Sequence, residues 1–578
     1  MKPEKIAPGL IVALEDYQQE GRAGLTRHLR SLGVISAEDS PKPPRAVVFI
    51  HCDEQARLDH LAQHGVRVNQ HMGRVRTAFL PLDSIELLSD DPAVQRIVPS
   101  RYLRLLMDVA PGKVRLPAFR SSSGLSGKGV ILGVVDSGID PNHAGFVGRI
   151  LRIWDQTLSG PGVPEGGYGA ELTGTLLTVS RDNHGHGTHV AGIAAGAHST
   201  FGGVAPGAEL VIVKSDLQDA HIADGIRYIF RVARDLGRPA VVNLSLGGHG
   251  DAHDGSDSLS QIIDSESGAG QIVCCAAGNE GNDNIHAQVA VPAGATRTIR
   301  FRVPASMIGV AWLNGWYPGA TFFEVSVRIP GGFVTPFQGV ISAGSPVRTY
   351  SLPDARIDVV TPGPDPANGD HNFFVRILGA SQGLAVKGGV WRLRVRNISA
   401  TGGRLDVWTL DDQQSPEVVF SGTSVRDSMK VGSPGAAASA VTAASYTTKV
   451  QWTDIDGHLQ HVGLDLDDIS DFSSEGPLRN GVQKPDVTAP GAMIASSLSA
   501  DSLPSRAQMI NTNYVVMAGT SMATPFITGV VALLLERDPA LDAAGVKALL
   551  RAHSSIPGQP AGTFDPKWGF GLTDALGL

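Results

Sequence analysis

The stretch AGTSMATPFITGVVALLLE, residues 518–536, is the most informative part of the chain. From Met522 onward its apolar residues cover nearly the whole circumference of a helix, which indicates a helix buried on all sides. Pro525 is compatible with this helix because proline is tolerated in the first turn. Ser521 therefore lies at a helix N-terminus, where unpaired amides and the helix dipole favour developing negative charge. An ordinary N-cap serine is the alternative interpretation.

The same tripeptide occurs a second time and serves as an internal control. Gly422-Thr-Ser424 is followed by Val-Arg-Asp instead of Ala-Thr-Pro, and no apolar helix comes after it. We therefore assign no role to Ser424.

An acidic residue ends an apolar strand in the segment GVVDSGID, residues 133–140. Asp136 follows the continuous apolar run 130–135, at the end of a strand where open α/β sheets place functional groups. A turn or helix-cap aspartate is an equally good interpretation of this segment alone.

A histidine-rich segment, NHGHGTHVAG, occupies residues 183–192. Glycines flank His186, so backbone or substrate can approach it closely, and the small residues after it suit a tightly packed helix. Three histidines in six residues raise a metal alternative. However, His184 and His186 are two positions apart and would face different sides of a helix, and no HExxH pattern accompanies them. We therefore expect no metal here.

The segment AAGNEG, residues 276–281, follows another apolar strand. The side-chain amide of Asn279 could donate a hydrogen bond to an oxyanion at that strand end. Taken alone, Asn-Glu-Gly indicates only a turn.

The surrounding sequence predicts an α/β fold. Runs at 130–135, 210–213, 240–244 and 272–276 are continuously apolar, as in parallel strands covered by helices on both faces. Residues 285–425 instead carry short alternating runs (298–303, 323–329, 373–377, 391–395 and 404–410) separated by Pro-Gly and Gly-Gly turns, which predicts an all-β sandwich. The α/β pattern resumes at residue 426, so the all-β unit is inserted within a single α/β domain.

The N-terminal part divides at the proline-rich linker SPKPP, residues 40–44. Before it we expect an extension with a helix over about 9–32. After it, residues 44–110 have the order β-α-β-β-α-β of a ferredoxin-like fold, with helices near 54–64 and 82–88. The predicted domains are 1–43 (extension), 44–110 (ferredoxin-like), 111–284 (α/β, first part), 285–425 (inserted sandwich) and 426–578 (α/β, second part).

Composition narrows the function classes. The chain has 578 residues, is 42% hydrophobic and has a formal net charge of −8 with no basic cluster, so we expect no nucleic-acid partner. No apolar run is long enough for a membrane span, and the run 10–14 is too short for a signal peptide. The three cysteines do not form a disulfide framework, which favours a reducing compartment. We therefore expect a cytoplasmic protein, with export by a route without a cleavable signal left open.

The four segments, in the order Asp…His…Ser, resemble the subtilisin family of serine peptidases. The resemblance covers 111–284 and 426–578. It implies that Asp136 is the acid, His186 the base, Asn279 the oxyanion donor and Ser521 the nucleophile, and that His189 is structural. It also implies two sets of substrate-binding residues. The first set would pair with the substrate backbone and consists of Ser245, Leu246 and Gly247. The second set would line the pocket for the residue before the scissile bond and consists of Ala276, Ala277, Gly278 and Gly432.

Two more likenesses concern the remaining domains. Residues 44–110 resemble the family's propeptide, an intramolecular inhibitor whose tail, here 101–110, enters the active-site cleft, and we expect a processing cut between about 103 and 114. The inserted sandwich resembles the jelly-roll insertion of clostridial germination proteases.

The sequence thus predicts a serine endopeptidase that acts on proteins or peptides through an acyl-enzyme intermediate and is made as a self-inhibited precursor. A pseudoenzyme or regulatory binding protein with this fold is the alternative. Small pocket walls without evident charge predict an apolar residue before the cleaved bond. No cofactor is required. Two acidic groups could bind calcium, but we expect solvated turns more strongly than calcium sites at both. The first group is Asp251, Asp254 and Asp257, and the second is Asp465, Asp467, Asp468 and Asp471. The oligomeric state does not follow from the sequence.

Overall fold

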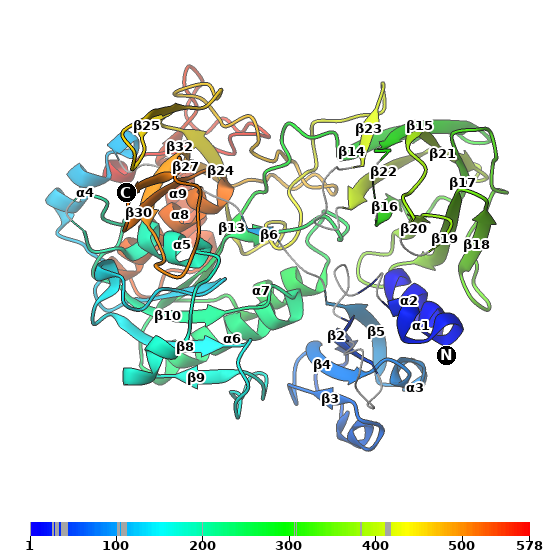
Figure 1. Ribbon diagram of the computed structural model, residues 1–578, viewed down its shortest axis with the longest axis horizontal. Helices are drawn as coiled ribbons and strands as arrows, with labels where there is room; N and C mark the ends of the chain where they lie inside the picture. Colours follow the sequence, from blue (N-terminus) through cyan, green and yellow to red (C-terminus); the bar gives the residue numbers. More distant parts are fainter. Residues whose placement is uncertain are drawn as a thin grey trace. The chain divides into compact units, whose positions relative to one another are not determined.

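The computed structural model describes residues 2–25, 28, 34–35, 44–100, 104–105, 112–198, 200–305, 307, 309–381, 384–410 and 418–578. The SPKPP linker except its last proline, and most of the predicted cut region 103–114, lie outside these residues. The chain forms two compact units (Figure 1). Unit 1 consists of residues 1–102 and 283–427, and unit 2 of residues 103–282 and 428–578.

A ten-stranded sheet forms the centre of unit 2. Its order is β31 (Ser554–Ser555), β32 (Leu572–Thr573), β27 (Val487–Ala492), β24 (Val441–Thr447), β13 (Gln271–Ala276), β11 (Ala240–Leu244), β7 (Ile131–Asp136), β10 (Glu209–Lys214), β8 (Ile150–Asp155) and β9 (Ala170–Leu172). All neighbours pair in parallel except β31 with β32 and β8 with β9. The four apolar runs found in the sequence are the adjacent strands β13, β11, β7 and β10, which confirms the predicted parallel sheet.

Helices cover both faces of this sheet. Leu132 and Val134 of β7 share a core with α5 (His186–Ala195) and α8 (Thr520–Arg537). On the other face, a Cβ at Gly133 would meet Ile229 of α6 (Asp219–Asp235). Every residue of α8 from Thr520 to Leu535 is buried, as its sequence predicts.

The other α-helices and β-strands described in unit 2 are short. They are α4 (Leu116–Ser123), α7 (Ser258–Glu266), α9 (Ala543–Ala552), β6 (Arg104–Leu105), β12 (Leu246–Gly247), β25 (Gln451–Thr453), β26 (Leu459–His461), β28 (Ile494–Ser497), β29 (Met509–Asn511) and β30 (Tyr514–Met517).

The inserted segment of unit 1 is a two-sheet sandwich. The larger sheet has the order β14 (His286–Val291), β22 (Gly403–Leu410), β16 (Val310–Tyr317), β20 (His371–Leu378), β19 (Ala355–Pro364) and β18 (Val347–Leu352). The smaller sheet has the order β17 (Phe323–Arg328), β21 (Gly389–Asn397), β15 (Thr296–Val303) and β23 (Val419–Ser421). Apolar side chains from both sheets form one core.

The N-terminal segment of unit 1 contains an antiparallel sheet in which β2 (Arg45–Cys52) pairs with β1 (Val34–Ile35), β5 (Val94–Pro99) and β4 (Val75–Pro81), and β4 pairs with β3 (Arg67–Val68). The strand order β5-β2-β4-β3 is that of a ferredoxin-like unit. The second expected helix is α3 (Ser84–Asp90), whereas the first is a 3-10 helix at Asp59–His64.

The helix expected over 9–32 is wrong in its length. α1 (Pro8–Glu20) ends at Gly21, whose φ of 62° lies in the left-handed region that glycine tolerates. The short helix α2 (Arg22–Leu25) follows. Residues 26–27 and 29–32 lie outside the described residues.

The two segments of unit 1 share a second hydrophobic core. In β16 and β20 successive side chains point to opposite faces. Phe373, Val375 and Ile377 enter the sandwich core, while Phe374 and Leu378 pack in a cluster with α1. The larger sheet is therefore buried on both sides, and one side is covered by the N-terminal segment.

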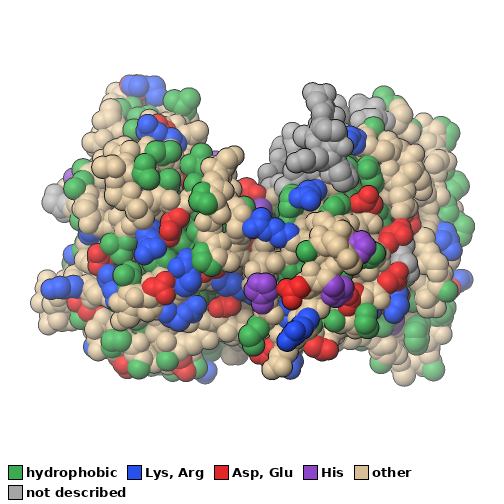
Figure 2. Space-filling view, turned by 90° about the horizontal axis from the view of Figure 1, so that it is seen from below, with side chains coloured by type: hydrophobic (Ala, Val, Ile, Leu, Met, Phe, Trp, Pro, Cys, Tyr) green, Lys and Arg blue, Asp and Glu red, His purple; other side chains and the backbone are tan. Residues whose placement is uncertain are grey.

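The surface in Figure 2 carries Lys/Arg and Asp/Glu side chains interspersed with each other and with hydrophobic ones. Among the described residues, no helix has the length and apolar character that a membrane crossing requires.

Candidate active site

Asp136 and His186 form a buried pair. Asp136 is the last residue of β7 and His186 the first of α5, and both side chains are fully buried. The His186 Nδ1 atom lies 2.8 Å from Asp136 Oδ1 and 3.0 Å from Oδ2. The carboxylate also accepts a 2.7 Å hydrogen bond from the Ser137 amide. This geometry orients the imidazole with Nδ1 toward the acid.

Close backbone packing brings the N-terminus of α5 to the end of β7. A Cβ at Gly187 would lie 2.1 Å from the Gly138 carbonyl oxygen, so only glycine fits there. Asp182, which the sequence analysis did not single out, connects the end of β7 to the start of α5 through hydrogen bonds. It accepts hydrogen bonds from Ser137 Oγ, from the Gly185 amide and from the amide and hydroxyl of Thr188. Its position just before a helix is the signal that could have identified it.

Ser521 is fixed at the N-terminus of α8 by the end of β11. Its hydroxyl donates to the Ser245 carbonyl at 2.9 Å, and the Ser245 hydroxyl donates back to the Ser521 carbonyl at 2.7 Å. Asn243 supports Ser245 through a 2.9 Å hydrogen bond and accepts one from Thr528. In this structure the Ser521 hydroxyl is thus directed to Ser245, and its contact with His186 stays a prediction.

Asn279 lies against the start of α8. Its Oδ1 accepts from the amide of Thr520 at 2.9 Å and from the Thr520 hydroxyl at 3.0 Å. With the oxygen engaged, the NH₂ group is the donor that remains for a ligand. Thr520 is a second residue that the sequence analysis missed, although it directly precedes Ser521.

The strand ends that carry these groups are neighbours in the sheet. β13, β11 and β7 are adjacent and parallel, with Leu244 paired to Cys275 and Asn243 to Val134. Ala276, Ser245 and Asp136 therefore occupy the same carboxyl edge. Because α5 and α8 pack in one core on one face, their N-terminal residues share that edge.

The segments predicted to bind substrate also come together. β12 forms an antiparallel pair with β6, with Leu246 opposite Leu105. The Gly248 amide donates to the Ser433 carbonyl at 3.0 Å, and a Cβ at Gly435 would lie 2.7 Å from the Ala276 carbonyl oxygen.

A family comparison decides the identity. The model described as "Subtilase family" matches residues 127–372 and 372–571, which is most of the chain. The chain belongs to the subtilase family. It is therefore a serine endopeptidase, a hydrolase of peptide bonds.

Individual relatives agree with this assignment. Subtilisin NAT of Bacillus subtilis subsp. natto is 28% identical over 307 residues, which cover 50% of this chain and 72% of that protein. Serine protease AprX of Bacillus subtilis strain 168 is 24% identical over 482 residues, 80% of this chain and 70% of that protein. The structure titled "Structure of the Clostridium Perfringens CspB protease" has a TM-score of 0.65 at 23% identity and covers 79% of this chain and 95% of that one. This last likeness shows the fold.

The other two histidines of the subtilase motif occupy different surroundings. His189 is fully buried, and its Nε2 lies 3.2 Å from the carbonyl oxygens of Ile494 and Val515. Burial is the main cause that lowers the pKa of His189 to about 3, so it stays neutral. His184 is exposed.

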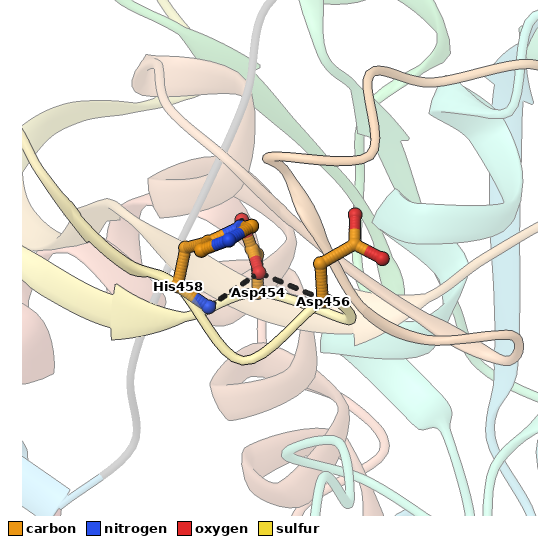
Figure 3. A group of neighbouring side chains, drawn as sticks. All are labelled: Asp454, Asp456 and His458. Atoms are coloured by element: carbon orange, nitrogen blue, oxygen red, sulfur yellow. Dashed lines mark hydrogen bonds and ion pairs between the residues drawn. The ribbon is translucent and has the colours of Figure 1, made fainter.

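One group of three potential metal ligands occurs among the described residues: Asp454, Asp456 and His458, in the turn between β25 and β26 (Figure 3). Asp454 accepts from the amides of Asp456 and His458 and from the Gln460 side chain, and Asp456 pairs with Arg506. These hydrogen bonds and the ion pair stabilise the turn between β25 and β26.

The acidic residues considered for calcium have protein partners too. Asp254 pairs with Arg479 at 2.9 Å, Asp257 caps α7 and accepts from Ser433, and Asp467 pairs with Lys113. Calcium binding stays a prediction, and no catalytic step below depends on it.

Proposed function

We propose that this subtilase cleaves peptide bonds through an acyl-enzyme intermediate on Ser521, and that it is made as a self-inhibited precursor. The observation that carries the proposal is the buried 2.8 Å contact between His186 Nδ1 and Asp136. A serine hydroxyl is a weak nucleophile until a base removes its proton, and this pair is a base already oriented by an acid.

In the proposed reaction the Ser521 hydroxyl turns from the Ser245 carbonyl toward His186 Nε2. Its oxygen attacks the substrate carbonyl carbon while His186 takes the proton, and Asp136 stabilises the imidazolium. The oxyanion accepts hydrogen bonds from the Asn279 NH₂ group and the Ser521 amide. His186 then protonates the departing amine, and water releases the acyl group by the reverse sequence.

Self-inhibition is supported by the pairing of β6 with β12. Residues 104–105 form an antiparallel strand beside Leu246 and Gly247, the residues proposed to pair with the substrate backbone. Main-chain hydrogen bonds of this kind are a general mode of peptide binding. We propose that residues 44–110 act as the inhibitor and that the cut falls between about 103 and 114.

Labelling with a fluorophosphonate and N-terminal sequencing test both parts together. We expect the wild-type chain to label and to start at a new residue within 103–114, and Ser521→Ala to do neither. Ser424→Ala is the matched control, since it lies in the second Gly-Thr-Ser, and it should behave as wild type. A wild-type chain that neither labels nor processes would favour the pseudoenzyme or binding-protein alternative instead.

The proposed location is a reducing compartment such as the cytoplasm. Its support is that Cys52, Cys274 and Cys275 are free and buried. We propose protein or peptide substrates and no required cofactor.

A further inference from the structure

A buried carboxylate lies directly behind the proposed pocket for the residue before the scissile bond. The loop 248–257 follows β12 and turns back toward Gly432. A Cβ built on Gly432 would lie 2.2 Å from the Gly248 carbonyl oxygen and 3.2 Å from Oδ1 of Asp251. The Asp251 carboxylate is therefore in van der Waals range of the backbone that lines the proposed pocket.

The fold holds this carboxylate in place. The Asp251 side chain is 4% exposed, and its Oδ2 accepts a 2.8 Å hydrogen bond from the His253 amide. A second buried acid, Asp257, accepts from Ser433 Oγ at 2.7 Å, on the residue next to Gly432. Two carboxylates thus face one short segment of the pocket wall.

Several titratable groups among the described residues lie near Asp251. From its own loop come His249, His253, Asp254 and Asp257, with His253 Nδ1 3.7 Å from Asp251 Oδ1. Two basic side chains lie on neighbouring segments. Arg479 donates to Asp254 at 2.9 Å, and Lys430 lies 3.7 Å from Glu475. Burial first, and then the charge of Asp257, raise the pKa of Asp251 to about 7.

We propose that Asp251 makes the pocket select a lysine or arginine before the cleaved bond. This rests on the proposed function, and it replaces the apolar preference expected from the small pocket walls. A cation entering the pocket would meet a fixed anion, and charge-assisted hydrogen bonds to a buried carboxylate are among the strong ones in proteins. Gly248 and Gly432 contribute no side chains of their own beside this acid.

Two peptides that differ only in the residue before the cleaved bond, Arg or Leu, provide the test. The full chain is used after its N-terminal cut, and its active-site concentration is set by fluorophosphonate titration. We expect kcat/KM for Arg to exceed that for Leu by about tenfold or more at pH 8.5. The Arg/Leu ratio should fall about tenfold or more by pH 5.5, because Asp251 becomes protonated. Taking the ratio removes any pH effect on the catalytic groups, because cleavage of both peptides depends on the same groups.

Asp251→Asn should lower the ratio to near or below one and remove its pH dependence, with hydrolysis of the Leu peptide within about threefold of wild type. Asp264→Asn, which changes an exposed acid on α7, should leave both unchanged. If Asp251→Asn does not fold, inhibition of the wild-type chain by the cation benzamidine is measured instead. This cation should inhibit cleavage of the Leu peptide more strongly as the pH rises.

The outcomes separate two failures. Cleavage of the Leu peptide at least as fast as the Arg peptide at every pH would overturn this inference alone. Absence of cleavage of either peptide, together with absence of labelling, would overturn the proposed function and the inference with it.

Discussion

Replacing Arg376 with Met should release the N-terminal segment from the inserted sandwich. Arg376 lies on β20 and is fully buried. Its guanidinium donates to both oxygens of Asp16 at 2.6 and 3.0 Å, and to Asp358 at 2.7 Å. Asp16 also lies 2.9 Å from His28. Asp16 and His28 belong to the segment before the predicted cut, so after cleavage this network would be a non-covalent contact between two fragments.

The magnitude follows from burial. Removing one partner of a buried ion pair costs about 3–5 kcal/mol, because the remaining charge is left uncompensated. At about 1.4 kcal/mol per tenfold, fragment binding should weaken by about a hundredfold to a few thousandfold. Burial alone would raise the pKa of Asp16, but hydrogen bonds and attraction from His28 and Arg376 hold it below its ordinary value. A lowered pKa stabilises the folded state above about pH 4. That contribution is lost as the pH falls further, so acid should also release the fragment.

The assay is size-exclusion chromatography of the cut chain over a dilution series, with the fragment detected by mass. Arg376→Met should raise the concentration at half-dissociation by the factor above, whereas Arg328→Met, an exposed arginine on β17, should not. Adding Asp16→Asn to Arg376→Met should recover part of the loss, because the buried charge is then removed. Equal half-dissociation concentrations for Arg376→Met and wild type would refute the reasoning.

Four shorter predictions follow from the site and its surroundings. Asn279→Ala should lower kcat by about 10²–10³ with little change in KM, since it removes one oxyanion donor. Gly187→Ala should lower both activity and the urea midpoint, because its methyl group would meet the Gly138 carbonyl at 2.1 Å; normal values for both would contradict this packing. Lys430→Met should destabilise unit 2 by about 1–3 kcal/mol, since Lys430 Nζ donates to the buried Gly281 carbonyl, and urea unfolding measures this. Burial raises the pKa of all three thiols, so iodoacetamide should modify them only after unfolding: Cys52, Cys274 and Cys275.

The parallel strands and the helix that the sequence predicted well are buried on all sides, and this burial requires a continuous local run of apolar residues. The four apolar runs became four adjacent strands because parallel strands are covered on both faces and need apolar residues at every position. The helix beginning at Thr520 was predictable for the same reason. In the sandwich, however, β14, β16, β18 and β19 were missed. The sequence of β16, VAWLNGWY, has Asn314 and Gly315 at its centre, and both residue types are depleted in strands.

The network around the site could not be read from the sequence. Asp182 and Thr520 act through contacts with segments 45 and 241 residues away, and no local pattern records such partners. Asp251 illustrates the same limit. In the sequence it is one of three acids in a glycine-containing loop, and only the fold places it beside Gly432.

The sandwich is inserted between two segments of unit 2 that carry proposed site residues. Unit 1 is entered at residue 283, four positions after Asn279, and left at 427, five positions before Gly432. One connection thus adjoins the proposed oxyanion donor and the other the proposed pocket wall, and Lys430 joins the two through its hydrogen bond to Gly281. A segment docked on the sandwich can influence catalysis only if it interacts differently with active and inactive states. The buried contacts of α1 with β20 dock the N-terminal segment on the sandwich within unit 1. An appended domain would have one connection to the catalytic unit, whereas this insertion has two, and each lies within five positions in the sequence of a residue proposed to contact substrate.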